Sequence, residues 1–275
     1  MDFKEFVQHL YSLRVYDLGQ PYFTGMPVHP EDPPFLMTIY KHHQDTAKIF
    51  EKIMRGFSYS LELIVTSMHS GTHIDALCHM AQYLKLYNGV SVSAILSQAG
   101  YTRYGADEIP IFVRRGILID VAAHLRTDYL PENYQIEPET LATITKIHGI
   151  SIGKGDAVLI RTGYGRLFSL DRDKYIYQFA GINERCAEWL LDYTPSIVGM
   201  DNLALSPTDS LKIHLKFLVE AGIYVIKNLN LEKLSADKIY EFILVVVPLN
   251  VPGATGSLVR PIALAPAPSA KPAGK

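Results

Sequence analysis

Residues 69–79 of the chain read His-Ser-Gly-Thr-His-Ile-Asp-Ala-Leu-Cys-His, a stretch that holds three of the ten histidines and an aspartate. Imidazole nitrogens and carboxylate oxygens are the atoms that bind zinc, manganese or iron in catalytic sites. The four side chains that could bind a metal occupy odd-numbered positions: His69, His73, Asp75 and His79. An extended strand would present all four on one face. The alternative is a polar turn followed by buried histidines, but the density of the cluster favours a metal site.

The local pattern around this cluster predicts how it is held. Gly71 and Thr72 favour a bend, so we expect the cluster at the end of a strand that runs into a loop. Residues 60–68 mix Leu, Ile and Val with polar side chains and predict a strand that leads into it.

Apolar periodicity along the rest of the chain predicts alternating strands and helices, which indicates a mixed α/β fold. The proline-rich stretch 19–34 predicts an irregular loop, and the alanine- and proline-rich end predicts a flexible tail over 265–275 after a single domain over 1–264. The predicted helices span 2–13, 138–148, 182–193 and 208–221, and the further strands span 115–121, 157–160, 198–201, 223–226 and 242–248.

Composition narrows the class of protein. The 275 residues are 48% hydrophobic and 20% charged, which is enough apolar material for a large core. The net charge is −2 without a basic run, so nucleic acid is not an expected partner. No apolar stretch reaches the roughly 18–20 residues that cross a bilayer, and charged residues interrupt the N-terminal segment, so we expect no membrane partner and a cytoplasmic location.

The cluster, read together with motifs further along the chain, resembles the signature of the cyclase-like metal hydrolases, the family of bacterial kynurenine formamidase and isatin hydrolase. The resemblance implies a single swivelling β/α/β domain with a mixed sheet, a small-molecule substrate, and assembly as a homodimer or homotetramer. The supporting motifs follow in the family's order at residues 26–34, 155–163, 198–201, 222–229, 253–257 and 260–263.

The resemblance also implies roles for individual residues. It assigns His69, His73 and Asp75 to one divalent metal, manganese or zinc, and it assigns proton transfer to His79. A fourth-ligand role for His79 is the alternative, and it would make the site more closed. His214 is implied as a ligand of a second metal or as a substrate contact, against the alternative of a histidine on a helix surface.

The resemblance places the proline-rich loop at the substrate. Four of its side chains are implied to cover one wall of the substrate pocket: Tyr22, Phe23, His29 and Phe35. The alternative is a surface connector without a role in binding.

Lys227 departs from the family pattern, which ordinarily carries glutamate at this position as a ligand of a second metal. An ammonium group has no lone pair and repels a nearby cation. Three interpretations follow, in order of preference: a single-metal enzyme, a lysine modified or deprotonated into a ligand, or a scaffold that has lost catalysis. A cationic side chain there could also bind a substrate carboxylate or an oxyanion.

The leading functional hypothesis is a metal-dependent hydrolase that cleaves an amide or cyclic amide C–N bond, with a lactone ester as a close variant. A catalytically silent binding protein is the alternative from another class, and Lys227 is its support. Ring closure in a biosynthetic reaction would use the same metal and base in reverse.

Overall fold

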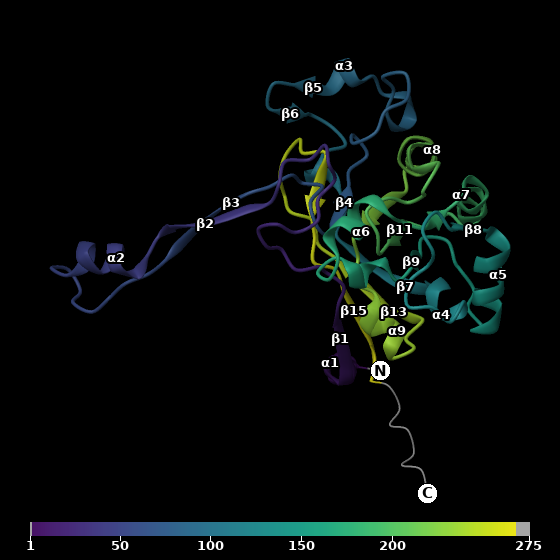
Figure 1. The fold of residues 1–275 in the computed structure, drawn as a ribbon, viewed down its shortest axis with the longest axis horizontal. Coiled ribbons are helices and arrows are strands. Elements are labelled where there is room, and N and C mark those ends of the chain that lie inside the picture. The colour runs from purple at the N-terminus through teal and green to yellow at the C-terminus, as the bar shows by residue number, and fades with distance from the viewer. Residues whose placement is uncertain (1, 268–275) are drawn as a thin grey trace, which may run out of the picture.

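A nine-stranded mixed sheet forms the centre of the computed structural model, which describes residues 2–267 (Figure 1). The four central strands β7, β9, β11 and β12 are parallel, and antiparallel strands flank them on both sides. The strand order is β1 (Leu13–Asp17), β15 (Ile262–Pro266), β13 (Glu241–Val246), β7 (Phe112–Asp120), β9 (Ala157–Arg161), β11 (Ile197–Met200), β12 (Tyr224–Lys227), β4 (His73–Asp75) and β14 (Gly256–Leu258).

The second half of β7 and all of β9 and β11 are buried and apolar, because both of their faces are covered. Successive side chains of β7 enter two different cores: Ile117 and Ile119 pack in one, and Leu118 packs in the other. The first core is completed by helices α5 (Pro138–Ile147), α7 (Glu184–Leu191) and α8 (Ser210–His214), which lie together on one side of the sheet (Figure 1). The predicted mixed α/β fold is therefore confirmed.

The predicted helices are present with shifted ends. Helix α8 (Ser210–His214) continues directly as a π-helical segment over Leu215–Ala221, so that His214 lies at the junction of the two parts. That segment stops at Gly222, whose φ of +66° favours glycine. The other helices are α1 (Phe3–Ser12), α2 (His43–Phe50), α3 (Val92–Ile95), α4 (Val121–His124), α5 (Pro138–Ile147), α6 (Arg172–Tyr177), α7 (Glu184–Leu191) and α9 (Glu232–Ala236).

Short elements complete the described part of the chain. Three single 3₁₀ turns cover Tyr87–Gly89, Ala106–Glu108 and Tyr164–Leu167. Three strand pairs of the described residues lie outside the main sheet: β2 (Leu36–Lys41) with β3 (Leu61–Val65), β5 (Leu96–Ser97) with β6 (Gly100–Tyr101), and β8 (Gln135–Ile136) with β10 (Gly181–Ile182). Over residues 2–267, none of the helices is both long and apolar enough to cross a membrane.

Two sequence expectations need correction. The strand predicted over 60–68 exists as β3 (Leu61–Val65), but it pairs with β2 (Leu36–Lys41) in a separate hairpin and does not enter the main sheet. The predicted tail boundary is also wrong, because β15 continues to Pro266 and buries Ala265 against β1. The small apolar residues at the end of β15 are compatible with a strand as well as with a flexible tail, so the sequence does not locate the boundary. Residues 268–275 of the predicted tail lie outside the described residues.

Candidate metal centre

The histidine cluster is built around the three-residue strand β4. This strand is paired on both sides, so that His73 lies opposite Lys227 of β12 and Leu258 of β14. His73 and Asp75 are two residues apart and share one face of the sheet. The pairing on both sides fixes the direction in which these two side chains point.

The other two members of the cluster, His69 and His79, are positioned by turns and do not belong to the strand. His69 precedes the bend at Gly71, where φ is +54°, and His79 follows a turn in which its N–H donates to the Ala76 carbonyl at 2.9 Å. One extended strand therefore does not align all four side chains. The predicted bend at Gly71 is present.

The bend before β4 is braced by residues far away in the sequence. The Tyr22 hydroxyl donates to the carbonyl oxygens of Ser70 and Thr72 at 3.1 and 2.7 Å. A Cβ atom at Gly71 would lie 2.8 Å from the Tyr22 ring. The Thr72 hydroxyl donates to the Asn228 carbonyl at 2.6 Å and ties the bend to the end of β12. Tyr22 therefore stabilises the bend that positions the histidine cluster.

The Asp75 carboxylate is the centre of the site and is fully buried. Its Oδ1 atom faces three histidines, with His69 Nδ1 at 3.0 Å, His73 Nε2 at 3.5 Å and His79 Nε2 at 4.0 Å. Its Oδ2 atom faces His214 Nε2 at 3.7 Å and Lys227 Nζ at 3.6 Å. The structure thus brings the other five predicted metal-site and proton-transfer residues around Asp75 and divides them between its two carboxylate oxygens.

Two of the imidazole rings direct lone pairs at this carboxylate. Nδ1 of His73 lies 2.8 Å from the Gly71 carbonyl, and Nδ1 of His214 lies 2.6 Å from the Ser210 carbonyl. A carbonyl oxygen only accepts, so each Nδ1 carries the proton and each Nε2 of a neutral ring has a free lone pair. Both Nε2 atoms and Asp75 Oδ2 are buried without a hydrogen-bond partner. Facing lone pairs and a carboxylate are satisfied when a cation lies between them, which fits a bound metal ion.

The protonation states suit metal binding. Burial favours a protonated carboxyl group, but the Lys227 ammonium and the nearby histidines hold the pKa of Asp75 well below its usual range. Burial lowers the pKa of His79 to about 3 and that of His214 to about 4. Both rings are therefore neutral near pH 7, as proton acceptance and metal binding both require.

The donor set fits a divalent ion. Among the described residues, potential ligand atoms of His69, Asp75 and His79 lie within 4.8 Å of one another. This group overlaps the predicted triad in His69 and Asp75 and contains His79 where the prediction has His73. His73 nevertheless presents its free Nε2 atom to the same carboxylate oxygen at a shorter distance than His79. Two or three imidazoles with one carboxylate are a donor set that suits manganese or zinc.

A cavity of about 230 Å³ opens onto the cluster. Of the four residues predicted to cover the substrate, the structure places His29 at this cavity and the three aromatic residues elsewhere. Phe35 is buried against Tyr22 with 5.7 Å between ring centroids, and Phe23 packs edge-on against Phe168 at 6.3 Å. The aromatic side chains anchor the loop in the body, and the shorter polar residues between them reach the cavity.

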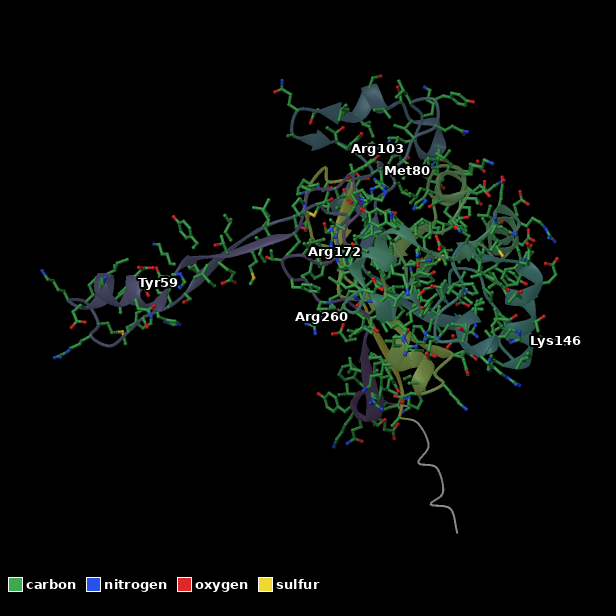
Figure 2. All side chains as sticks on the ribbon, in the orientation of Figure 1. Tyr59, Met80, Arg103, Lys146, Arg172 and Arg260 are labelled. Carbon is green, nitrogen blue, oxygen red and sulfur yellow. The ribbon has the colours of Figure 1, made fainter. Side chains whose placement is uncertain are left out.

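Several residues at the cavity have no feature in the sequence that identifies them as part of a site. Asp32 belongs to the proline-rich motif but is not distinguished there. Thr255 does not line the cavity, but its hydroxyl lies 2.9 Å from His69 Nε2. The apolar wall comes from loops and from the start of α8, and a lone methionine or leucine gives no sequence signal. The additional lining residues are Glu31, Asp32, Met80 (labelled in Figure 2), Leu203, Ala204, Ser210 and Leu211.

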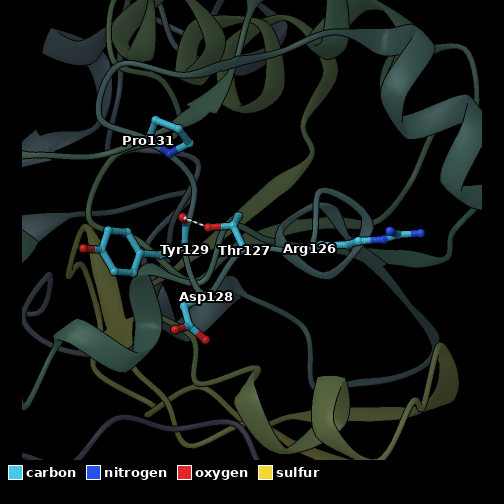
Figure 3. Close-up of a pocket in the computed structure, with 5 residues that line it drawn as sticks. All are labelled: Arg126, Thr127, Asp128, Tyr129 and Pro131. Carbon is cyan, nitrogen blue, oxygen red and sulfur yellow. Dashed lines mark hydrogen bonds between the residues drawn. The ribbon is translucent and has the colours of Figure 1, made fainter.

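A second hollow of about 670 Å³ lies on the surface along the loop that follows α4 (Figure 3). It is lined by Arg126, Thr127, Asp128, Tyr129 and Pro131. The Thr127 hydroxyl donates to the Tyr129 carbonyl at 2.8 Å, and Asp128 forms an ion pair with Arg166. None of the described residues there belongs to a group of potential metal ligands, so the smaller cavity at Asp75 is the candidate site.

Asp201 supports the turn that follows β9. Its Oδ1 atom accepts hydrogen bonds from the Thr162 N–H at 2.8 Å and from the Thr162 hydroxyl at 2.7 Å. Its Oδ2 atom accepts from the Gly163 N–H at 2.8 Å. Asp201 does not line the cavity at Asp75, so its role is to hold a turn and not to bind a ligand.

Comparisons with known proteins agree with this architecture. The model of the family described as putative cyclase matches residues 16–207. Cyclase-like protein 2 from Oryza sativa subsp. japonica is 24% identical over 215 residues, which cover 78% of this chain and 68% of that protein. A crystal structure described as a novel cyclase superposes with a TM-score of 0.84 and 28% identity, covering 94% of this chain and 88% of that chain. Isatin hydrolase A from Labrenzia aggregata has the same fold, with a TM-score of 0.71, 23% identity and coverage of 96% and 98%.

Proposed function

Because this chain belongs to the cyclase family, we propose that it is a metal-dependent hydrolase that cleaves an amide or cyclic amide C–N bond, with a lactone ester as a close variant. The observation that carries the proposal is the buried Asp75 carboxylate, which faces unpartnered imidazole nitrogens at the end of a cavity. The hydrolase names among proteins of the same fold support the reaction class.

Different residues of the site would perform the separate steps of such a reaction. A divalent ion, manganese or zinc, held by His69, His73 and Asp75 would supply Lewis acidity and activate water. His79 is neutral and lies on the Oδ1 side of Asp75 at the cavity, where it can accept a proton from water and return it to the leaving group. The small cavity and its leucine walls restrict access to a small substrate.

Removal of the His79 imidazole tests its assignment as the proton-transfer residue. We expect His79→Ala to lower turnover by at least about 100-fold, the usual contribution of a positioned acid–base group, while one metal equivalent per chain remains. Turnover would be measured on a panel of cyclic amides and lactones, and metal content by elemental analysis.

The exposed His124 supplies a matched control, because His124→Ala removes an imidazole far from the cavity and should leave both quantities unchanged. Loss of the metal in His79→Ala would show that His79 is a ligand. Retention of both metal and turnover would exclude the proposed role.

The charge of Lys227 explains why the site would bind one metal ion and not two. Its ammonium lies 3.6 Å from Asp75 Oδ2, on the side of the carboxylate that His214 also faces. This positive charge takes the place of a second cation and repels one that approaches. The Oδ1 side, with its three histidines, is then the side that binds the ion.

The substitution Lys227→Glu should therefore raise the metal content from one equivalent to two, because a second carboxylate would face Asp75 Oδ2 and His214. Elemental analysis of dialysed protein measures the stoichiometry. Lys227→Met removes the charge without adding an oxygen ligand and should stay at one equivalent. Two equivalents in the unaltered protein would contradict this account of Lys227. Activity that appears only in Lys227→Glu would favour the alternative of a silent binding protein.

A further inference from the structure

Asn228 directly follows β12 and joins the end of this strand to the bend before β4. It is buried, and its φ of +58° lies in the left-handed region, which asparagine tolerates better than most residues do. Its N–H donates to the Asn202 carbonyl at 3.1 Å, and its carbonyl accepts from the Thr72 hydroxyl at 2.6 Å. Both backbone polar groups of Asn228 are therefore bonded, which fixes the position of its side chain.

The side-chain amide of Asn228 can be oriented in only one way. One of its two terminal atoms lies 2.7 Å from the Gly71 carbonyl oxygen, and the other lies 2.7 Å from the hydroxyl of Tyr175, a buried residue of α6. The Gly71 carbonyl only accepts, so the atom that faces it is Nδ2, and Oδ1 faces Tyr175. The Tyr175 hydroxyl then donates to Oδ1. A chain of two hydrogen bonds thus runs from Tyr175 through Asn228 to Gly71.

The Gly71 carbonyl also accepts the proton of His73. Nδ1 of this ring lies 2.8 Å from the carbonyl oxygen, while Nε2 lies 3.5 Å from Asp75 Oδ1 on the other side. A neutral imidazole has one N–H, which can serve only one of these two acceptors. A proton on Nδ1 leaves the Nε2 lone pair free for a metal ion, whereas a proton on Nε2 would face Asp75 and block that ligand atom.

The direction of the Gly71 carbonyl therefore decides which tautomer His73 adopts. Gly71 has no Cβ atom and tolerates a wide range of backbone conformations. A rotation of the peptide group after Gly71 would turn the carbonyl away from His73, and Asp75 would be the acceptor that remains. The amide of Asn228 opposes this rotation, because its Nδ2 atom binds the same carbonyl oxygen from the end of β12.

We propose that Asn228 is a positioning residue of the metal centre and that Tyr175 acts through it. Asn228 holds the Gly71 carbonyl, the carbonyl keeps the proton of His73 on Nδ1, and Nε2 stays available as a ligand atom. Neither Asn228 nor Tyr175 lines the cavity at Asp75, so neither contacts a substrate there. The inference rests on the proposed function, because it takes His73 as a ligand of the metal ion.

Nuclear magnetic resonance of the metal-free protein with ¹⁵N-labelled histidine tests the inference, because ring-nitrogen chemical shifts distinguish a protonated from an unprotonated nitrogen. The signal of His73 is identified by its absence from His73→Gln. Asn228→Gly removes the amide at a φ that glycine tolerates, and Tyr175→Phe removes only the hydroxyl. We expect His73 to be protonated on Nδ1 in the unaltered protein and to become a mixture of both tautomers in each variant.

The affinity for manganese, measured by calorimetric titration, is the second readout. Hydrogen-bond partners that orient metal-ligating histidines contribute roughly 10- to 100-fold to metal affinity. We therefore expect Asn228→Gly to weaken manganese binding at least about tenfold, and Tyr175→Phe to weaken it less. Since Tyr175 acts through Asn228, adding Tyr175→Phe to Asn228→Gly should cause no further loss. Independent, additive losses would contradict the role given to Tyr175.

Two matched controls separate positioning from a general loosening of the fold. Tyr164 is as buried as Tyr175, but its hydroxyl has no hydrogen-bond partner among the described residues. Tyr164→Phe should therefore leave the His73 tautomer and the manganese affinity unchanged. His214 is an internal control, because the Ser210 carbonyl holds its Nδ1 proton independently of Asn228. Its tautomer should stay the same in every variant.

A His73 ring that keeps its proton on Nδ1 in both Asn228→Gly and Tyr175→Phe would overturn the inference. Equal changes in the tautomers of His73 and His214 would overturn it too, because they would show that the whole site had loosened. Failure of the proposed function is distinguishable from either result. If the unaltered protein bound neither manganese nor zinc, the spectra of the metal-free protein would still show whether Asn228 sets the tautomer of His73.

Discussion

Replacing Asp75 with asparagine should lower the affinity for manganese or zinc by more than about 100-fold, because it removes the one carboxylate that faces all the histidines of the site. The change has a second effect. Lys227 would keep its positive charge beside the site without the counter-charge of Asp75, and it would then repel the ion more strongly. Isothermal titration calorimetry of metal-free protein, together with elemental analysis, measures the loss.

Asp32 provides a matched control for this variant. It also lines the cavity, but its carboxylate accepts from the Ser67 hydroxyl at 3.1 Å and is not in the group around Asp75. Asp32→Asn should bind metal with nearly unaltered affinity. A circular dichroism spectrum of each variant separates loss of binding from loss of fold. Undiminished affinity in Asp75→Asn, or equal losses in both variants, would contradict the assignment of Asp75 as the central ligand.

Replacing Asp201 with asparagine should lower the free energy of unfolding by on the order of 3 kcal/mol, because it leaves buried donors of the β9 turn without acceptors. The carboxylate accepts from Thr162 through Oδ1 and from the Gly163 N–H through Oδ2. An asparagine has one oxygen, and its amide nitrogen would face a second donor. Urea denaturation at a fixed protein concentration measures the change.

The exposed Asp173 is the control for Asp201. Asp173→Asn alters a carboxylate on the surface of α6 and should change the unfolding free energy by less than about 0.5 kcal/mol. A loss of less than about 1 kcal/mol in Asp201→Asn would show that the turn does not depend on this carboxylate.

The parallel centre of the fold could be predicted from sequence because its strands are buried on both faces. β7, β9 and β11 therefore appear as short apolar runs between turns. β4 could not be delimited in this way, because three residues give no periodicity and its length is set by pairing with β12 and β14. The local sequence also could not show that β3 pairs outside the main sheet, because exposed and buried apolar strands have the same composition.

The candidate site was predictable to the extent that its residues are close in sequence. His69, His73, Asp75 and His79 stand out because they occur together, whereas His214 and Lys227 were singled out only by resemblance to a family. The wall of the cavity was not predictable, because Asp32 and Leu211 meet there through the path of two loops. The aromatic residues of the proline-rich loop do not line this cavity, and the sequence could not show this because it does not indicate which way a loop side chain points.

The pairing of Lys227 with His73 across β12 and β4 has a consequence for how such proteins diverge. The histidine motif and the residue at position 227 lie on different strands, so a single codon change can alter the charge of the site while the motif stays intact. Lineages with the same motif can therefore differ in the number of ions they hold. Grouping relatives by the residue at this strand position should separate their chemistries better than overall identity does.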